Sequence, residues 1–179
     1  YNTNAYSRVV NVLESAAGLN RNELTEQWLS PLQMKNSVWK VRRFAKSDPQ
    51  TNRHGWVTSA RDLARLGLLV SANGDWKDRA VIQNKDYVRH MLQSSQRLNP
   101  AYGYLWWLNG ESHALRAGRR RAGPLNPNAP EDMVAGRGAL GRKLYVVPSL
   151  QLVIVRLGEE PEVGFDRNFW GHFNVVLGR

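Results

Sequence analysis

Two short segments of the sequence carry groups that suit hydrolytic chemistry. Tyr1 stands just before a predicted helix, and residues 136–141 form a glycine-rich stretch (Gly-Arg-Gly-Ala-Leu-Gly) between two predicted strands. Glycine lets a backbone approach a ligand closely, and an exposed amide in such a turn can donate a hydrogen bond to a developing oxyanion. Each segment also has an ordinary explanation, because a tyrosine near a helix start usually packs and Gly-x-Gly usually marks a turn.

One Ser-x-x-Lys tetrapeptide, Ser37-Val-Trp-Lys40, has the spacing of a nucleophile and its lysine base. On the first turn of a helix this spacing sets an ammonium one turn away from a hydroxyl, where it can act as a base. The surrounding residues have no helical period and no capping residue, and so short a pattern often arises by chance. We therefore expect that Ser37 is not a nucleophile.

Several other chemistries lack the residues that they need. The sequence has no cysteine, which excludes disulfides, thiolate zinc sites and cysteine nucleophiles. It has neither a Gly-x-Ser-x-Gly elbow nor a Gly-x-x-x-x-Gly-Lys phosphate loop. Its four histidines are not at metal-ligand spacing: His54, His90, His113 and His172. We expect neither a metal nor a cofactor.

The elements that must position these groups are helices first and strands afterwards. Apolar residues recur at helical spacing over residues 6–17, 23–29, 59–71 and 83–92. Asn22 is expected to cap the second helix, and Thr58 or Ser59 the third. Strand-like runs cover residues 102–108, 133–135, 143–147 and 151–157, the last two as an antiparallel hairpin, before a C-terminal helix that begins near Phe165. This order predicts an α+β fold with an antiparallel sheet.

Two segments lack the hydrophobic periodicity of either a helix or a strand. Residues 31–57 are expected to be irregular loop with short extended pieces, and residues 109–131 a polar basic loop. The second segment contains Arg116-Ala-Gly-Arg-Arg-Arg121. A solvated loop is its default interpretation, and a role at the mouth of a substrate pocket is the alternative.

The charge of the protein is strongly positive. Lys and Arg number 25 against 15 acidic residues, giving a net charge of +10. That balance suits phosphates, acidic lipid or an anionic substrate, but most charges are scattered singly, as in a basic protein whose arginines cover apolar surface. Four tryptophans fall on apolar faces or a strand, where packing explains them better than base stacking: Trp28, Trp106, Trp107 and Trp170. We expect no nucleic-acid partner and no membrane span, since no apolar run approaches the ~20 residues that a span needs.

Several segments occur in an order that is familiar. They cover nearly all of the chain: Tyr1-Asn-Thr-Asn4, Trp28-Leu-Ser-Pro-Leu-Gln-Met34, Gly55–Gly67, Tyr102-Gly-Tyr-Leu-Trp-Trp107, Ala135–Arg142, Tyr145-Val-Val-Pro148 and Leu152–Arg156. Together they resemble the C-terminal half of the serine β-lactamase/penicillin-binding-protein superfamily. The most similar branch is that of the class C-like esterases and aminohexanoate-dimer hydrolases. The resemblance implies a β-lactamase/transpeptidase-like α+β fold, with helices flanking an antiparallel sheet.

The resemblance also implies a serine hydrolase with three motifs. Tyr1 matches the tyrosine of the second motif, which works with a lysine as general base and acid. Gly136, Arg137 and Gly138 match the third, Lys-Thr-Gly-like motif, which lines the substrate pocket, and the amide of Ala139 matches the second donor of the oxyanion hole. The lysine of the third motif is missing here, which favours esterase or amidase chemistry over β-lactam recognition. Arg137 then either supplies positive charge to a substrate carboxylate or is an outward-facing structural arginine.

The first motif, Ser-x-x-Lys, precedes the tyrosine motif in the family, and this chain begins at the tyrosine. We therefore expect residues 1–179 to be the C-terminal portion of one catalytic domain, with a mostly helical part over 1–100 and the sheet and last helix over 101–179. The expected partners are the N-terminal half of the same enzyme and a small ester or amide substrate. A Ser-x-x-Lys that opens an apolar helix upstream would decide the class.

The resemblance has consequences for self-association and location, and it leaves alternatives to an enzyme. The sheet of the family combines strands from both ends of the chain, so this piece alone should expose a sheet edge and self-associate. The resemblance favours a periplasmic or secreted location but leaves the compartment open. The alternatives to an enzyme are a catalytically inactive β-lactamase-like protein and a basic module that binds nucleic acid or a protein partner.

Overall fold

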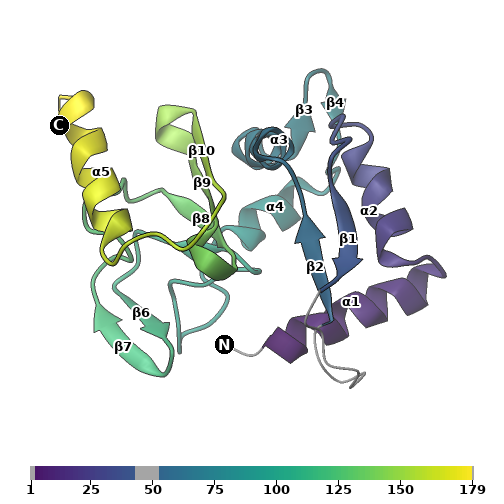
Figure 1. The fold of residues 1–179 in the computed structure, drawn as a ribbon, viewed down its shortest axis with the longest axis horizontal. Helices are drawn as coiled ribbons and strands as arrows, with labels where there is room; N and C mark the ends of the chain where they lie inside the picture. The colour runs from purple at the N-terminus through teal and green to yellow at the C-terminus, as the bar shows by residue number, and fades with distance from the viewer. Residues whose placement is uncertain (1–2, 43–52, 179) are drawn as a thin grey trace. The chain divides into compact units, whose positions relative to one another are not determined.

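The computed structural model describes residues 3–42 and 53–178 of the chain (Figure 1). Tertiary contacts divide the chain into two compact units, residues 1–65 and 66–179. Helices and small antiparallel sheets make up both units, as expected for an α+β protein. The division falls inside helix α3 (Ala60–Ser71).

The first unit opens with helices α1 (Thr3–Ala17) and α2 (Arg21–Leu29). The cap of α2 is Asn20 and not Asn22, because the Asn20 side chain accepts hydrogen bonds from the backbone N–H groups of Asn22 and Glu23. The Glu23 carboxylate in turn accepts from the Asn20 N–H at 2.8 Å, which completes a capping box. The helix thus starts two residues before the point that the predicted cap would give, at Arg21 and not at Glu23.

The segment expected to be irregular contains a regular hairpin. Strands β1 (Val38–Val41) and β2 (His54–Val57) pair antiparallel, with Trp39 opposite Trp56. The two indole rings lie edge to face with their centroids 5.0 Å apart. This cross-strand aromatic pair supplies the packing that fixes the register, a long-range contact that local periodicity does not reveal.

Helix α3 (Ala60–Ser71) begins at the cap expected from the sequence, since the Ser59 hydroxyl accepts from the Asp62 N–H at 3.2 Å. Its later turns belong to the second unit. A Cβ built on Gly67 would lie only 2.5 Å from Val153 and 2.9 Å from Leu144. Glycine therefore lets this helix lie directly on one face of the main sheet.

The main sheet has the order β10-β9-β8-β5 and is antiparallel throughout. Its strands are β5 (Trp107–Leu108), β8 (Val134–Arg137), β9 (Lys143–Val147) and β10 (Leu152–Arg156). The expected β9–β10 hairpin is confirmed, with Val147 opposite Leu152. The strand expected over 102–108 is far shorter, because Leu105 takes a left-handed conformation with φ 65° and turns the chain.

Helix α5 (Phe165–Val176) covers the other face of this sheet (Figure 1). Trp170 is fully buried between the helix and the sheet, where it packs edge-on against Tyr145 with ring centroids 5.4 Å apart. The buried core on this face consists of Met133, Ala135, Tyr145, Val147 and Trp170. Strand residues alternate between faces, so Ala135 and Arg137 of β8 both point towards α5.

Smaller elements connect α3 to the sheet. Strands β3 (Asp75–Trp76) and β4 (Arg79–Ala80) form a short hairpin, and helix α4 (Lys85–Met91) follows with Asn84 as its cap. The polar segment expected to be loop over 109–131 instead contains a second hairpin, β6 (His113–Arg116) and β7 (Arg119–Ala122). Left-handed residues Ala117 (φ 49°) and Gly118 (φ 75°) make its two-residue turn, as tight hairpins require.

Candidate functional site

The glycine-rich segment forms the turn between β8 and β9. Gly138 donates its N–H to the Arg142 carbonyl at 2.8 Å, which extends the ladder one step beyond the strands. Residues 139–141 then make a single 3₁₀ turn in which Leu140 is left-handed (φ 55°) and Gly141 has φ +63°. A Cβ on Gly141 would also collide with Pro161 at 2.6 Å. The turn therefore needs glycine at residue 141 for both its dihedral angle and its space.

Ala139 stands at the start of this turn with an unused donor. Among the residues that the structure describes, its N–H finds no hydrogen-bond acceptor, and the residue is solvent-exposed. Gly138 before it is extended, with φ −108° and ψ 174°. An exposed and unpaired amide on a fixed turn can donate to a negatively charged oxygen without first giving up an internal bond.

The strand that leads into the turn has an uncovered edge. In the described part of the sheet, β5 pairs only with Val134 and Ala135 of β8. Gly136 and Arg137 lie beyond that pairing on the β5 side, while their other side pairs with Leu144 and Lys143 of β9. The three residues predicted to line a pocket, together with Ala139, thus follow one open stretch of strand and turn.

Arg137 points to the α5 face and is bound there. Its guanidinium donates to Asp166 Oδ2 at 3.2 Å, and the side chain keeps only 18% of its exposure. Lys143, directly opposite on β9, donates to Asp166 Oδ1, as does the Tyr145 hydroxyl at 2.7 Å. One carboxylate on the first turn of α5 therefore holds two cations and a phenol at the base of the turn.

Burial and charge shift the pKa values of this cluster in different directions. Burial lowers the pKa of Lys143, although the hydrogen bond to Asp166 opposes that shift. Burial raises the pKa of Asp166, but the hydrogen bonds from Lys143 and Tyr145 lower it by more than burial raises it. The net pKa of Asp166 therefore lies below its usual value. Burial and the neighbouring carboxylate raise the pKa of Tyr145, so this phenol stays protonated.

Arg156 of β10 fixes the turn from the other side. Its Nη1 donates to the carbonyl oxygens of Leu140 and Gly141, each at 3.3 Å. Its guanidinium carbon lies 5.1 Å from the centre of the Phe165 ring, and the Lys143 ammonium lies 5.5 Å from the same centre. Arg156 thereby joins β10 to both the turn and the first residue of α5.

The residues predicted from the sequence have different outcomes. Gly136, Arg137, Gly138 and Ala139 lie together on β8 and the turn, whereas Tyr1 lies outside the described residues, so its position relative to them stays a prediction. Sequence reasoning missed Asp166, Lys143 and Arg156. The alternation of Lys143 and Tyr145 on β9 could have placed both on one face, but no local signal links them to Asp166.

The Ser37 side chain makes two hydrogen bonds within the first unit. Its hydroxyl lies 2.7 Å from the Thr58 hydroxyl and donates to Asp62 Oδ2 at 3.0 Å. The Asp62 side chain is fully buried and also accepts from the Asn36 N–H at 2.7 Å. These bonds tie the start of β1 to the first turn of α3.

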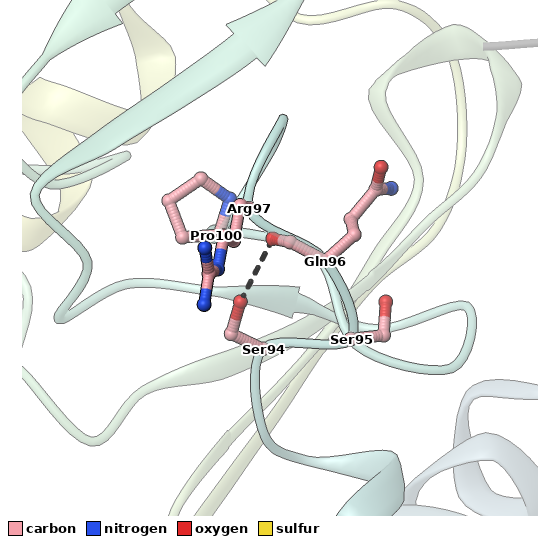
Figure 2. A pocket seen from close by; sticks show the side chains of 5 residues that line it. All are labelled: Ser94, Ser95, Gln96, Arg97 and Pro100. Carbon is pink, nitrogen blue, oxygen red and sulfur yellow. Dashed lines mark hydrogen bonds between the residues drawn. The ribbon is translucent and has the colours of Figure 1, made fainter.

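An open pocket elsewhere in the second unit contains none of the predicted residues. Five residues line it, as Figure 2 shows: Ser94, Ser95, Gln96, Arg97 and Pro100. The Ser94 hydroxyl donates to the Gln96 carbonyl at 3.2 Å, and that of Ser95 donates to the Tyr102 carbonyl at 2.9 Å. Both hydroxyls therefore close turns in this loop.

Residues 3–42 and 53–178 contain neither of two further kinds of site. Within these ranges, no group of three or more potential ligand side chains could hold a metal ion. Within the same ranges, no helix has the length and apolar character that a membrane crossing requires.

Comparison with known proteins shows the fold. Neither a protein-family model nor a curated protein sequence matches this chain. A solved structure that matches is described as "Crystal structure of putative beta-lactamase from Bacteroides dorei DSM 17855", with a TM-score of 0.58 and 14% sequence identity. The match covers 93% of this chain and 54% of that chain, so this chain spans about half the length of its structural neighbour. The chain has a β-lactamase-like α+β fold.

Proposed function

We propose that this chain forms the C-terminal portion of a β-lactamase-related serine hydrolase, an esterase or amidase of the class C-like esterase and aminohexanoate-dimer hydrolase branch. The observation that carries the proposal is the exposed Ala139 N–H, which has no acceptor among the described residues and stands on the fixed turn after an open strand edge, in a chain with a β-lactamase-like fold. The nucleophilic serine and its lysine belong to a Ser-x-x-Lys motif on an N-terminal partner segment.

The reaction proceeds through an acyl-enzyme. The serine Oγ attacks the carbonyl carbon of an ester or amide, and its proton passes to the Tyr1 phenolate, which the ammonium of the lysine stabilises. The negative oxygen of the tetrahedral intermediate accepts hydrogen bonds from the serine amide and from Ala139, and loss of one such donor typically costs ~3–4 kcal/mol. Collapse of the intermediate breaks the bond to the alcohol or amine, which leaves with the proton from Tyr1. Water then attacks the acyl-enzyme by the same path and releases the acid.

Tyr1 needs help to act as a base near neutral pH. A free tyrosine has a pKa near 10, and an adjacent ammonium lowers it by stabilising the phenolate. The lysine of the Ser-x-x-Lys motif supplies that charge in the proposed site. Gly136 and Gly138 let the substrate approach the strand, and Arg137, oriented by Asp166, adds a fixed positive charge beside it.

A labelling experiment on the full-length protein tests this function. A serine-directed fluorophosphonate should label one serine upstream of Tyr1, and Tyr1→Phe should lower the labelling rate at neutral pH by roughly 10²–10⁴-fold, the usual worth of a general base. Tyr104→Phe is the matched control, because the Tyr104 side chain is exposed on a turn and the change keeps its ring. Unchanged labelling and turnover in Tyr1→Phe would overturn the assignment, as would the absence of any labelled serine.

A further inference from the structure

The β6–β7 hairpin gathers arginines on one of its two faces. Arg116 pairs with Arg119 across the strands and Ala114 pairs with Arg121, so these four side chains share one face. Leu115 and its partner Arg120 lie on the opposite face. Ala114 is almost fully buried, so the face that carries Arg116 and Arg121 is the one that lies against the rest of the second unit.

Arg116 of β6 is half-buried. No hydrogen bond or ion pair of its guanidinium occurs within the described part of the chain, and none of its nitrogens is sealed from solvent. Burial lowers the pKa of Arg116, and the positive charges of Arg137 and Arg121 lower it further, against the carboxylate of Asp166. These three neighbours therefore lie within electrostatic range of Arg116, and Figure 1 shows the hairpin near the first turn of α5.

The cluster has more positive charge than its single carboxylate can balance. Asp166 already accepts from Arg137, Lys143 and Tyr145, which occupies both of its oxygens. Arg116 and Arg121 are left without an acidic partner among the described residues. Like charges gathered at a partly buried point raise the energy of the free protein, and an anion bound there would relieve that repulsion.

We propose that Arg116, Arg121 and Arg137 form a binding site for the phosphate group of a small-molecule ligand. A planar guanidinium presents a fork of N–H donors that matches the oxygens of a phosphate, and two or more forks around one point hold a dianion. The site shares Arg137 with the proposed substrate pocket, but phosphate binding goes beyond the proposed hydrolase function and can be measured without it.

The placement of the arginines favours a single phosphate group over an extended polyanion. Arg116 is half-buried, shares its face of the hairpin with Arg121, and interacts electrostatically with Arg137 and Asp166. A polynucleotide would be attracted by the exposed arginines on both faces of the hairpin, and Arg120 would then contribute as much as Arg121. The two faces of one hairpin thus provide a test and its own control.

The experiment measures binding of inorganic phosphate to the full-length protein at constant ionic strength, by isothermal titration and by the thermal unfolding midpoint. We expect saturable binding that Arg116→Gln and Arg121→Gln each weaken by about tenfold or more, as expected when a charge-assisted contact is lost. Arg116→Lys should keep part of the affinity. Arg120→Gln, on the opposite face of the same strand pair, should bind phosphate as the wild type does.

Arg121 is exposed, so Arg121→Gln keeps the test decisive even where Arg116→Gln perturbs folding. The absence of saturable phosphate binding would overturn the proposal. So would an equal loss in Arg120→Gln, or binding of a labelled oligonucleotide to which both faces contribute alike, since either result would describe a diffuse polyanion surface. Neither outcome would affect the fluorophosphonate test of the hydrolase.

Discussion

Arg137 at the end of β8 and Asp166 in the first turn of α5 form an ion pair, with Nη2 and Oδ2 3.2 Å apart. The same carboxylate holds Lys143, which stands directly opposite Arg137 on β9. Both strands are therefore clamped to one helix immediately before the turn that exposes the Ala139 amide. A charge on α5 sets the base of that turn, 29 residues away in sequence from Arg137.

Removing this carboxylate should destabilise the fold. Asp166→Asn leaves the buried Lys143 and the partly buried Arg137 without their counter-charge, and we expect a loss of about 2–3 kcal/mol, less than for a fully buried pair because Arg137 and Asp166 keep some exposure. Urea unfolding of both proteins at pH 7 measures the difference. The control is Asp86→Asn, whose exposed pair with Arg89 should contribute no more than about 0.5 kcal/mol. Equal losses in the two variants would contradict the clamp.

The same substitution makes a prediction about pH. Because the pKa of Asp166 is lower in the folded protein than in the unfolded chain, its contribution to stability is present above the unfolded pKa of about 3.9. That contribution is lost as the pH falls through the lower, folded pKa. The stability difference between wild type and Asp166→Asn should therefore be constant near neutral pH and shrink in acid. A difference that grows on acidification would show that the shift has the opposite sign.

The contact of α3 with the sheet predicts an exception to helix propensity. Alanine normally stabilises a helix interior by about 1 kcal/mol over glycine. In Gly67→Ala the new methyl group would lie within 2.5 Å of Val153 and 2.9 Å of Leu144, and such overpacking costs about 1–3 kcal/mol. We expect a net loss of stability for Gly67→Ala in denaturant titration. Gly171→Ala on α5 meets only the Asn128 amide at 3.4 Å, and this control should be neutral or stabilising.

The comparison of sequence and structure separates local from long-range information. Helical period predicted the helices, and the Pro-Ser connection predicted the β9–β10 hairpin, because these signals act within a few residues. The cap of α3 was also predicted, whereas that of α2 is Asn20 and not Asn22. The β1–β2 hairpin was missed because it depends on Trp39 and Trp56 meeting across an intervening segment. The β6–β7 hairpin was missed because the consecutive arginines of β7 give no alternation of apolar and polar residues, which is the usual sign of a strand.

The candidate site divides in the same way. The glycine-rich turn could be located from the sequence, since the three glycines within residues 136–141 predict a tight connection between two strands. The clamp could not, because Asp166 looks like an ordinary acidic residue in the first turn of a helix. Only packing of α5 on the sheet brings that carboxylate to Arg137, Lys143 and Tyr145.

Ser37 is predicted to matter for stability and not for catalysis. Ser37→Ala removes hydrogen bonds to Thr58 and to the buried Asp62, and we expect a loss of about 1–2 kcal/mol. The rate of fluorophosphonate labelling of the full-length protein should stay at the wild-type value. Labelling abolished in Ser37→Ala, with the fold intact by circular dichroism, would make Ser37 the nucleophile and refute its structural role.

The open edge of the main sheet predicts self-association of residues 1–179 alone. Strand β10 is the outermost strand of the described sheet and is rich in half-buried apolar residues. Sedimentation velocity should show dimers or larger species that decrease when an N-terminal complement is supplied. A monomer with a sharp cooperative melt would contradict this expectation.

The most direct test removes a single hydrogen-bond donor, the Ala139 N–H, from the turn. Ala139→Pro deletes the N–H, and the site accepts proline because Ala139 starts a 3₁₀ turn after an extended Gly138 with ψ 174°. The measurement is kcat/KM for an ester substrate in the full-length protein, with Ala139→Ser as the control that keeps the N–H. We predict a loss of roughly 10²–10³-fold in the proline variant, with an unchanged melting temperature, and the wild-type rate in the serine variant. A folded Ala139→Pro enzyme with the wild-type rate would contradict the proposed oxyanion hole.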